Sequence, residues 1–437
     1  MSWKSAESRD KKTVLFLVDD VTRFGGVRTR VTEELSCLSA SDDISPIVVS
    51  RCNSRNLMVI PSAIGSIGAE VGFPINGFAY PKIPHGGFAL LYEISFLLNF
   101  ALSVLMMIPI VCFRRVSVVY GHNNEAGLTA VALSRAFGIP CIVDLHGVEV
   151  DEYLEKHPNW EATSRRIRFW RRIERKILVS ADCVITVSRP HSAETLARGG
   201  SASRTTVVPC FADERKFDFD PEARARIRAA LGFAQDEIVY VYSGILPAKH
   251  DSSSPLSLFA RLAPSSQYRL LVLAPDDDSL ATARGQLAPS IAARSVLLQV
   301  PRSEVPKYLS AADIAILIRK PTVVNRVASP TKFAEYLLCG LPVIISEGIG
   351  DSSDLVRSKG VGVVILSTEV DDSRVSAVTA KVRELVSPRE RSRVRAVGED
   401  SLSRKRWSPH FLEILRSALN RDMCKPDTLE QGGNDGS

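Results

Sequence analysis

Short apolar runs alternate with amphipathic segments along almost the whole chain. The run from Val14 to Val18 predicts a strand, and a loop holding Gly25 and Gly26 leads from it into helical periodicity from Val27 to Leu38. The same alternation predicts further strands in the first half at residues 44–49, 116–120, 140–145, 184–187 and 206–208. Strands that alternate with helices are typical of a parallel sheet covered by helices on both faces.

A second alternation of the same kind begins after Pro209. Its predicted strands are 238–243, 269–274, 296–300, 314–318, 342–346 and 362–365. The pattern therefore predicts an α/β fold with two doubly wound Rossmann-like domains facing a central cleft, and it places ligands at the carboxyl ends of the strands. The predicted division is 1–212 for the first domain, 213–402 for the second, 403–420 for a helix returning to the first domain and 421–437 for a disordered tail.

Length and composition limit the class of protein. A single hydrophobic core stops growing at roughly 250 to 300 residues, so a chain of 437 residues is not one small module. With 45% hydrophobic and 24% charged residues, collagen-like, low-complexity and wholly disordered chains are excluded. The net charge of +6 permits contact with anionic lipid or phosphate, and it is too small to indicate nucleic acid as a partner.

The eight cysteines are scattered, with no CxxC and no spacing typical of a zinc site. This use of cysteine favours a reducing compartment. The first twelve residues are polar and charged, whereas a secretory signal needs an apolar stretch behind a short basic lead. We therefore expect a cytoplasmic location.

The segment from Val327 to Val343 predicts a loop, a helix, a turn and a buried strand. Ser329 fits the N-cap position and Pro330 the first helical position, so the N–H groups of the next three residues would be open to an anion. A diphosphate there would gain the positive end of the helix, with Lys332 as a countercharge. Glu335, one turn further on, could accept from the hydroxyls of a ribose. An ordinary capped helix with Glu335 on its surface is the alternative.

The run SPTKFAEYLLCGLPVI, at residues 329–344, resembles the donor-binding segment of the family-four retaining glycosyltransferases of GT-B fold, particularly the bacterial enzymes of surface polysaccharide assembly. Further motifs agree in order and extend the resemblance from about Lys12 to Trp407. They are FGGV at 24–27, YGHNN at 120–124, LHG at 145–147, IERKILVSADCVITVS at 173–188, VVPCFADERKF at 207–217, YSG at 242–244 and SAADIAIL at 310–317.

The resemblance implies a nucleoside-diphosphate sugar as donor, bound by the second domain, and a glycan or lipid-linked acceptor, bound by the first. It implies transfer with retention and no metal or other cofactor. Fixed positive groups would stabilise the charge that builds on the departing diphosphate. By the family pattern, His146 and Lys249 would act at the reacting centre, His146 beside the donor sugar and Lys249 at the leaving phosphate. The other implied donor-binding residues are Gly25, Gly26, Gly244, Ser329, Thr331, Lys332 and Glu335.

Three positions depart from the family pattern. Val327 stands where a second glutamate is usual, Ile245 where an arginine is usual, and Cys210 where an asparagine is usual. Two alternatives therefore stay open. One is a weakly active or inactive nucleotide-sugar-binding paralogue that acts as a scaffold, and the other is a sugar-nucleotide epimerase on the same two-domain plan.

Two histidines follow predicted strands, and histidine titrates most easily near neutral pH. The pattern favours a functional role for His146 and leaves His122 open between a functional and a structural role. Three aspartates, Asp19, Asp144 and Asp313, could be acid or base groups. Because Asp144 lies inside a predicted strand and Asp313 is placed to cap its neighbour, we assign none of them a catalytic role.

Residues 94–113 carry no charge, and this segment is long enough to span a membrane. Crossing a membrane here would separate the strands before this segment from the strand at 116–120, so a span is disfavoured. A helix buried against the sheet and a helix whose outer face enters the lipid interface are the remaining alternatives. We expect an exposed apolar face on an otherwise packed helix.

A second segment, Arg165–Leu178, combines an apolar stripe with seven basic residues. The stripe is formed by Ile167, Trp170, Ile173 and Ile177. A basic amphipathic helix of this kind suits anionic lipid, while an inward stripe beneath a solvated face is the structural alternative. The hypothesis is that both segments dock the acceptor domain on the inner surface of the cell membrane.

Overall fold

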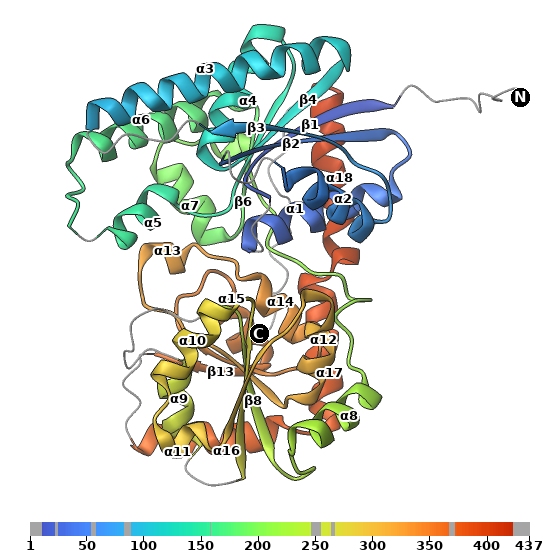
Figure 1. Cartoon of the computed structure of the whole chain (residues 1–437), viewed down its shortest axis with the longest axis vertical. Coiled ribbons are helices and arrows are strands. Elements are labelled where there is room, and N and C mark those ends of the chain that lie inside the picture. The colour runs from blue at the N-terminus through green and yellow to red at the C-terminus, as the bar shows by residue number, and fades with distance from the viewer. Residues whose placement is uncertain are drawn as a thin grey trace, which may run out of the picture. The chain divides into compact units, whose positions relative to one another are not determined.

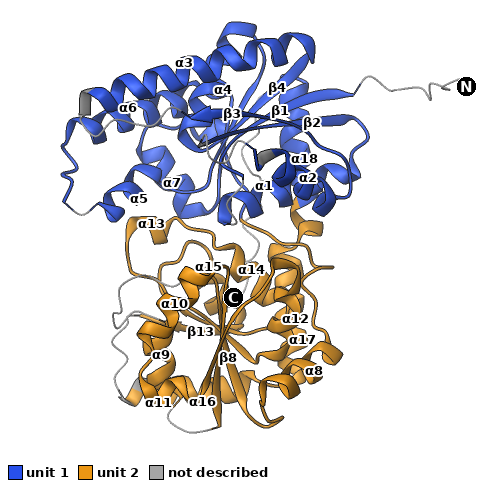
Figure 2. Cartoon of the chain, in the orientation of Figure 1, with its two compact units in different colours: residues 1–209, 408–437 blue, residues 210–407 orange. Residues whose placement is uncertain are grey.

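The computed structural model describes residues 11–21, 25–53, 58–82, 89–157, 159–245, 255–263, 267–366 and 372–422. The chain divides into two compact units (Figure 2). Unit 1 consists of residues 1–209 and 408–437, and unit 2 of residues 210–407. The first division thus falls after Pro209, close to the boundary at 212 that the sequence predicts. Of the tail predicted to be disordered, residues 423–437 lie outside the described residues.

Unit 1 is built on a seven-stranded sheet in the order β3-β2-β1-β4-β5-β6-β7, in which every neighbouring pair is parallel (Figure 1). The strands are β1 (Lys12–Asp19), β2 (Ile44–Asn53), β3 (Asn76–Lys82), β4 (Val116–His122), β5 (Cys141–Leu145), β6 (Cys183–Thr186) and β7 (Thr205–Val207). The middle strands are fully buried, as β1 shows at Val14, Leu15 and Phe16. Burial on both faces explains why these strands read as continuous apolar runs.

Helices connect and cover these strands. They are α1 (Gly26–Cys37), η1 (Leu38–Ala40), α2 (Ile60–Val71), α3 (Ala89–Phe113), α4 (Asn123–Phe137), α5 (Glu149–Lys156), α6 (Arg165–Ser180), α7 (Arg189–Ala197) and η3 (Ala202–Arg204). The last helix, α18 (Arg404–Leu419), belongs to unit 1 from Ser408 onward. One core layer joins Leu15, Val119 and Val143 of the sheet to Ala130 of α4 and Ile177 of α6.

Unit 2 repeats the plan with six parallel strands in the order β10-β9-β8-β11-β12-β13. The strands are β8 (Ile238–Ser243), β9 (Tyr268–Ala274), β10 (Ser295–Gln299), β11 (Ile314–Leu317), β12 (Val343–Ser346) and β13 (Gly362–Ile365). The helices are α8 (Pro221–Leu231), α9 (Pro255–Leu262), α10 (Asp277–Gln286), α11 (Pro289–Ala292), η4 (Arg302–Glu304), α12 (Val305–Ala311), α13 (Val323–Arg326), α14 (Thr331–Leu338), α15 (Ser352–Lys359), α16 (Asp372–Leu385) and α17 (Pro388–Leu402).

The prediction of two doubly wound parallel α/β domains is confirmed. In each sheet the strand order reverses at one point, between β1 and β4 in unit 1 and between β8 and β11 in unit 2. At such a reversal the connecting helices leave toward opposite faces of the sheet, which opens a crevice at the carboxyl ends of the two strands. These two edges are therefore where a ligand site is to be sought in each unit.

Candidate active site

The crevice of unit 1 is bordered by the start of α1. Gly25 precedes this helix in an extended conformation, with a φ of 173°, and Gly26 is its first residue. Among the described residues, none would lie within 4 Å of a Cβ atom added at either glycine. The packing of the protein therefore does not itself require glycine here, and the predicted approach of a phosphate to this backbone stays a prediction.

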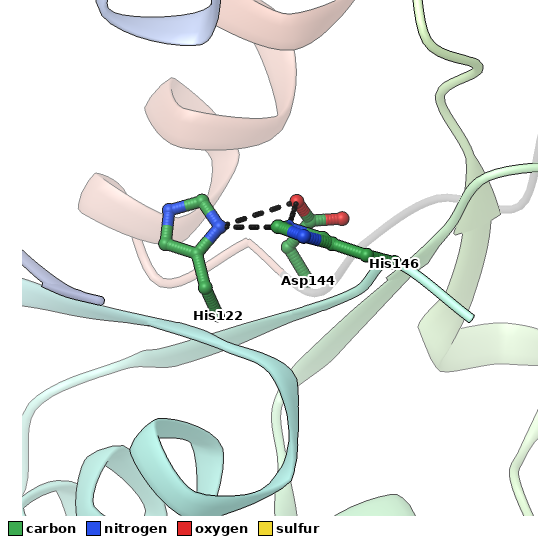
Figure 3. Close-up of side chains that lie close together, drawn as sticks. All are labelled: His122, Asp144 and His146. Carbon is green, nitrogen blue, oxygen red and sulfur yellow. Dashed lines mark hydrogen bonds and ion pairs between the residues drawn. The ribbon is translucent and has the colours of Figure 1, made fainter. Parts of the chain in front are cut away.

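Two histidines and an aspartate meet at the carboxyl ends of β4 and β5 (Figure 3). His122 is the last residue of β4, Asp144 lies in β5, and His146 directly follows β5. The His146 Nε2 atom lies 2.9 Å from Asp144 Oδ2 and 3.0 Å from His122 Nδ1. His122 and Asp144 are buried, whereas His146 is partly accessible. From the sequence, the role of His122 stayed open and Asp144 was assigned no catalytic role. In the structure, both side chains contact His146.

Arg30 of α1 completes this cluster from the other side. Its guanidinium donates from Nε to Asp144 Oδ2 at 2.6 Å and from Nη2 to Asp144 Oδ1 at 2.9 Å. Nη1 donates to the carbonyl of Val208 at 3.0 Å, and Glu34 lies 3.0 Å from Nε through its Oε1 atom. Arg30, Glu34 and Asp144 are all almost completely buried.

The charges in the cluster follow from burial and from these contacts. Burial alone would raise the pKa of Asp144, but Arg30 and the two histidines hold it well below its usual range. Burial and the neighbouring Asp144 raise the pKa of Glu34 well above its usual value. Burial lowers the pKa of His122 to about 4. At neutral pH the cluster therefore contains an aspartate anion, an arginine cation and a neutral His122, while the raised pKa of Glu34 favours its protonated form.

The ionised Asp144 fixes the orientation of the His146 ring. Because a carboxylate accepts only, His146 Nε2 must carry the proton that it shares with Asp144 Oδ2. The other ring nitrogen, Nδ1, is buried, and among the described residues it has no hydrogen-bond partner. The protein thus holds the His146 ring through Nε2, next to Asp144 and His122.

His122, Asp144 and His146 could also ligate a metal, since their ligand atoms lie within 4.8 Å of one another. However, Arg30 already donates to both carboxylate oxygens of Asp144. A metal cation bound at Asp144 would lie beside the guanidinium, and like charges at that distance repel strongly in a buried site. The donor set therefore fits a hydrogen-bonded cluster better than a metal centre.

The asparagines that follow His122 hold the neighbouring loop. The His146 N–H donates to Asn123 Oδ1 at 2.9 Å, and the Asn124 N–H donates to Glu149 Oε2 at 2.8 Å. Asn123 has a φ of 63°, a left-handed conformation that asparagine tolerates better than most residues. Burial raises the pKa of Glu149 to about 8. The YGHNN and LHG motifs thus form one connected structure around His146.

In unit 2 the glycine at the end of β8 and the helix α14 lie side by side. Gly244 has a φ of 121°, which strongly favours glycine. A Cβ atom at Gly244 would lie 2.6 Å from Nζ of Lys332. Lys332 Nζ lies 4.7 Å from the ring centre of Tyr242, and Tyr336 Oη accepts from the Ser243 N–H at 2.9 Å. The structure therefore brings together Gly244 and Lys332, two of the residues predicted to bind the donor.

The start of α14 differs from the prediction. The helix begins at Thr331 with Pro330 in the N-cap position, so Ser329 is not its cap. The Ser329 hydroxyl instead accepts from the Cys210 N–H at 2.9 Å, because the polar segment after Pro209 passes close to it. The Phe333 N–H donates to the Pro330 carbonyl at 2.9 Å. In the part of the chain that the structure describes, the N–H groups of Thr331 and Lys332 have no acceptor, as is usual in the first turn of a helix.

Glu335 is buried and forms an ion pair with Arg302, a residue that the sequence did not single out. The Arg302 guanidinium also lies 5.5 Å from the ring centre of Phe217. This pairing orients the Glu335 carboxylate, and the predicted contact with a ribose stays a prediction. Lys249, predicted to act at the leaving phosphate, lies outside the described residues.

Sequence reasoning also missed Arg30 and Glu34. Both lie in α1, one turn apart and on its buried side. The available signal was an arginine and a glutamate four residues apart immediately after a Gly-Gly loop. Such a pair is usually solvent-exposed, so the pattern alone did not distinguish a buried pair from a surface one.

Comparison with known proteins shows which proteins this chain resembles. Residues 25–210 match the glycosyl transferase 4-like domain. The chain is 27% identical over 228 residues to the teichuronic acid biosynthesis glycosyltransferase TuaC of Bacillus subtilis, a match that covers 52% of each chain. It is 24% identical over 238 residues to the GDP-mannose-dependent alpha-(1-6)-phosphatidylinositol monomannoside mannosyltransferase of Mycolicibacterium smegmatis, covering 53% of this chain and 60% of the relative. The chain thus aligns with little more than half the length of these curated relatives.

The fold is similar to that of Anabaena HepE in complex with UDP. The TM-score is 0.67 at 17% sequence identity, covering 93% of this chain and all of HepE. The GT-B fold implied by the sequence motifs is confirmed, and so is the resemblance to family-four glycosyltransferases.

Proposed function

We propose that this chain, which carries a glycosyl transferase 4-like domain, is a glycosyltransferase that uses a nucleoside-diphosphate sugar as donor and a glycan or lipid-linked molecule as acceptor. Unit 2 binds the donor nucleotide and unit 1 the acceptor. The sugar is transferred with retention of anomeric configuration, without a metal or other cofactor, in the assembly of a surface polysaccharide. The observation that carries the proposal is the placement of Lys332 against Gly244 beside two open N–H groups of α14.

That arrangement suits a diphosphate. The amides of Thr331 and Lys332 supply two donors, the helix end adds partial positive charge, and the Lys332 ammonium adds a full charge. Gly244 allows a ligand to reach the backbone at the end of β8. All of these groups stabilise the negative charge that develops on the diphosphate as the bond to the sugar breaks.

In unit 1, His146 directly follows β5 and its side chain is partly accessible. Asp144 holds its ring in place, and Arg30 in turn holds Asp144. This supports a role in orienting the transferred sugar. HepE has been solved with UDP and with UDP-glucose, so uridine nucleotides are the first donors to try. No disulfide joins any of the described cysteines, which fits a cytoplasmic location.

A catalytically weak nucleotide-sugar-binding scaffold is the second candidate. Val327, which stands where the family usually has a glutamate, is completely buried and offers no polar group. Ile245, which stands where an arginine is usual, has a largely exposed apolar side chain. Both differences remove groups that would contact the donor.

One experiment separates the two candidates. Thermal-shift screening with UDP, GDP and ADP sugars identifies the nucleotide, and release of free nucleoside diphosphate from the best sugar donor is then followed with and without acceptor extracts. Slow donor hydrolysis that an acceptor accelerates supports transfer. Binding without turnover under every acceptor supports the scaffold, and the absence of binding to any nucleotide contradicts both.

A further inference from the structure

Helix α3 has an outer face that is almost entirely apolar. It is the one helix in the described part of the chain that is long and apolar enough to cross a membrane, and only 28% of its most apolar window, within Leu91–Phe113, is buried. Exposed positions recur every three or four residues along one side. The large apolar side chains exposed on α3 are Leu91, Ile94, Leu97, Leu98, Leu105, Met106, Ile108 and Phe113.

The polar side chains of α3 point inward instead. Ser95, Asn99 and Ser103 are buried, and each bonds to a carbonyl one turn or less before it in the helix. Tyr80 of β3 also donates from Oη to Ser103 Oγ at 2.8 Å. A helix that faces water carries its polar residues outside and its apolar residues inside. The reversed order in α3 indicates that its outer face is not adapted to water.

α3 does not cross a membrane. It connects β3 to β4, and both strands belong to the same seven-stranded sheet of unit 1. A transmembrane helix would place these strands on opposite sides of the bilayer. An exposed apolar face on a helix that cannot span fits a position parallel to the surface of a membrane.

Helix α6 lies beside α3 and supplies charge of one sign (Figure 1). Phe96 of α3 packs on Trp170 of α6 with ring centres 5.0 Å apart, and Glu93 accepts from Arg165 Nε at 2.8 Å. The exposed charged side chains of α6 are all basic, and they are Arg165, Arg168, Arg172, Arg175 and Lys176. The single acidic residue of α6, Glu174, is buried and paired with Arg171 and Arg198.

We propose that α3 and α6 form a membrane-docking surface. The apolar face of α3 lies among the acyl chains of the interfacial layer, and the outer basic residues of α6, together with Arg114 and Arg115 after α3, contact anionic headgroups. A second copy of the chain fits this surface less well, because pairing two α3 helices would bring two basic α6 faces close to each other. Docking through this surface does not require the chain to transfer sugar. If the proposed function holds as well, docking favours a lipid-linked molecule as the acceptor.

Vesicle partition of the full-length chain tests the proposal. We expect it to sediment with vesicles of phosphatidylcholine and phosphatidylglycerol. Leu98→Gln with Leu105→Gln should weaken partition by on the order of tenfold, because two leucines no longer enter the lipid. The matched control is Leu196→Gln with Leu366→Gln, which changes exposed leucines elsewhere; Leu105 and Leu366 are both 59% exposed. This control should bind as the unaltered chain does.

The charge component has its own variant pair. Arg168→Glu with Arg172→Glu should weaken partition to anionic vesicles at low salt by at least roughly fivefold for each arginine. Arg226→Glu with Arg284→Glu makes the same change at exposed positions of unit 2 and should have a much smaller effect. Thermal melting confirms that each variant is folded.

Three outcomes would overturn the proposal. The unaltered chain could fail to bind anionic vesicles, or both leucine pairs could weaken binding equally. Alternatively, sedimentation velocity without lipid could show a dimer that only the Leu98 and Leu105 changes dissociate, which would identify a second copy as the occupant. Nucleotide binding by the unaltered chain is measured in parallel, so a failure of docking is distinguished from a failure of the proposed function.

Discussion

Arg30 and Asp144 form a buried ion pair with two hydrogen bonds, of 2.6 and 2.9 Å, between α1 and β5. The pair joins the helix that follows the Gly-Gly loop to the strand that carries His146. A buried pair of this kind adds little net stability compared with apolar residues, but removal of one partner leaves an uncompensated charge. Its role is therefore to fix the geometry around His146.

Arg30→Met should destabilise the protein strongly, because Asp144 would lose its countercharge while remaining buried. We expect the free energy of unfolding to fall by about 3 to 5 kcal/mol, measured by urea denaturation at neutral pH. The control is Arg357→Met, which breaks exposed pairs with Glu347 and Asp354 and should cost less than about 1 kcal/mol. If the free energy of unfolding falls by a similarly small amount in both variants, the buried Asp144 does not depend on Arg30 as its countercharge.

Acid should destabilise the protein through its buried histidines. Burial lowers the pKa of His122 from 6.5 to about 4, and that of His191 likewise. Since the folded state resists protonation, the stability that these residues contribute is present above pH 6.5 and is lost as the pH falls toward about 4. His122→Gln removes one of these two groups, so the variant should lose less stability across that range than the unaltered chain does.

The comparison is made by urea denaturation at a series of pH values between neutral and about 4. His157→Gln, which changes an exposed histidine, is the matched control and should keep the pH dependence of the unaltered chain. If His122→Gln and His157→Gln give parallel curves, His122 is not buried in its neutral form.

The sheets were predictable because buried parallel strands read as unbroken apolar runs. β3 was not predicted, since it carries Gly77 and Pro81, lies at the edge of the sheet and is partly exposed. The N-cap assignment of Ser329 was wrong for a different reason. Its hydroxyl bonds to Cys210, more than a hundred residues away in the chain, and local helix signals carry no information about such a partner.

Gly244→Ala should weaken nucleotide binding by roughly tenfold or more. The left-handed φ disfavours any side chain, and the new Cβ atom would displace the Lys332 ammonium. Isothermal titration with UDP measures the dissociation constant, and thermal melting measures stability. Gly285→Ala is the matched control, because Gly285 lies in α10 with open space around it, and alanine there should stabilise the helix slightly. Unchanged UDP binding in Gly244→Ala would place the diphosphate elsewhere.

Lys332 and Glu335 should differ in which part of a nucleotide they recognise. Lys332→Ala removes a charge from the diphosphate position, so it should weaken binding of both UDP and inorganic pyrophosphate. Glu335→Gln removes a charged acceptor from the ribose position and should weaken UDP by about 1 to 3 kcal/mol, with pyrophosphate unchanged. Glu304→Gln alters a half-exposed acid of η4, which pairs with Lys307, and should affect neither ligand.

The pairing of Glu335 with Arg302 makes the pyrophosphate measurement necessary. Loss of this ion pair could shift α14 and weaken every ligand, whether or not Glu335 touches a ribose. Arg302 is 38% exposed, so water can solvate it when its partner is neutral, and the structural disturbance should be small. Arg302→Met breaks the same ion pair while keeping the glutamate. If Glu335→Gln and Arg302→Met weaken UDP and pyrophosphate equally, Glu335 acts by positioning α14, and a ribose contact is contradicted.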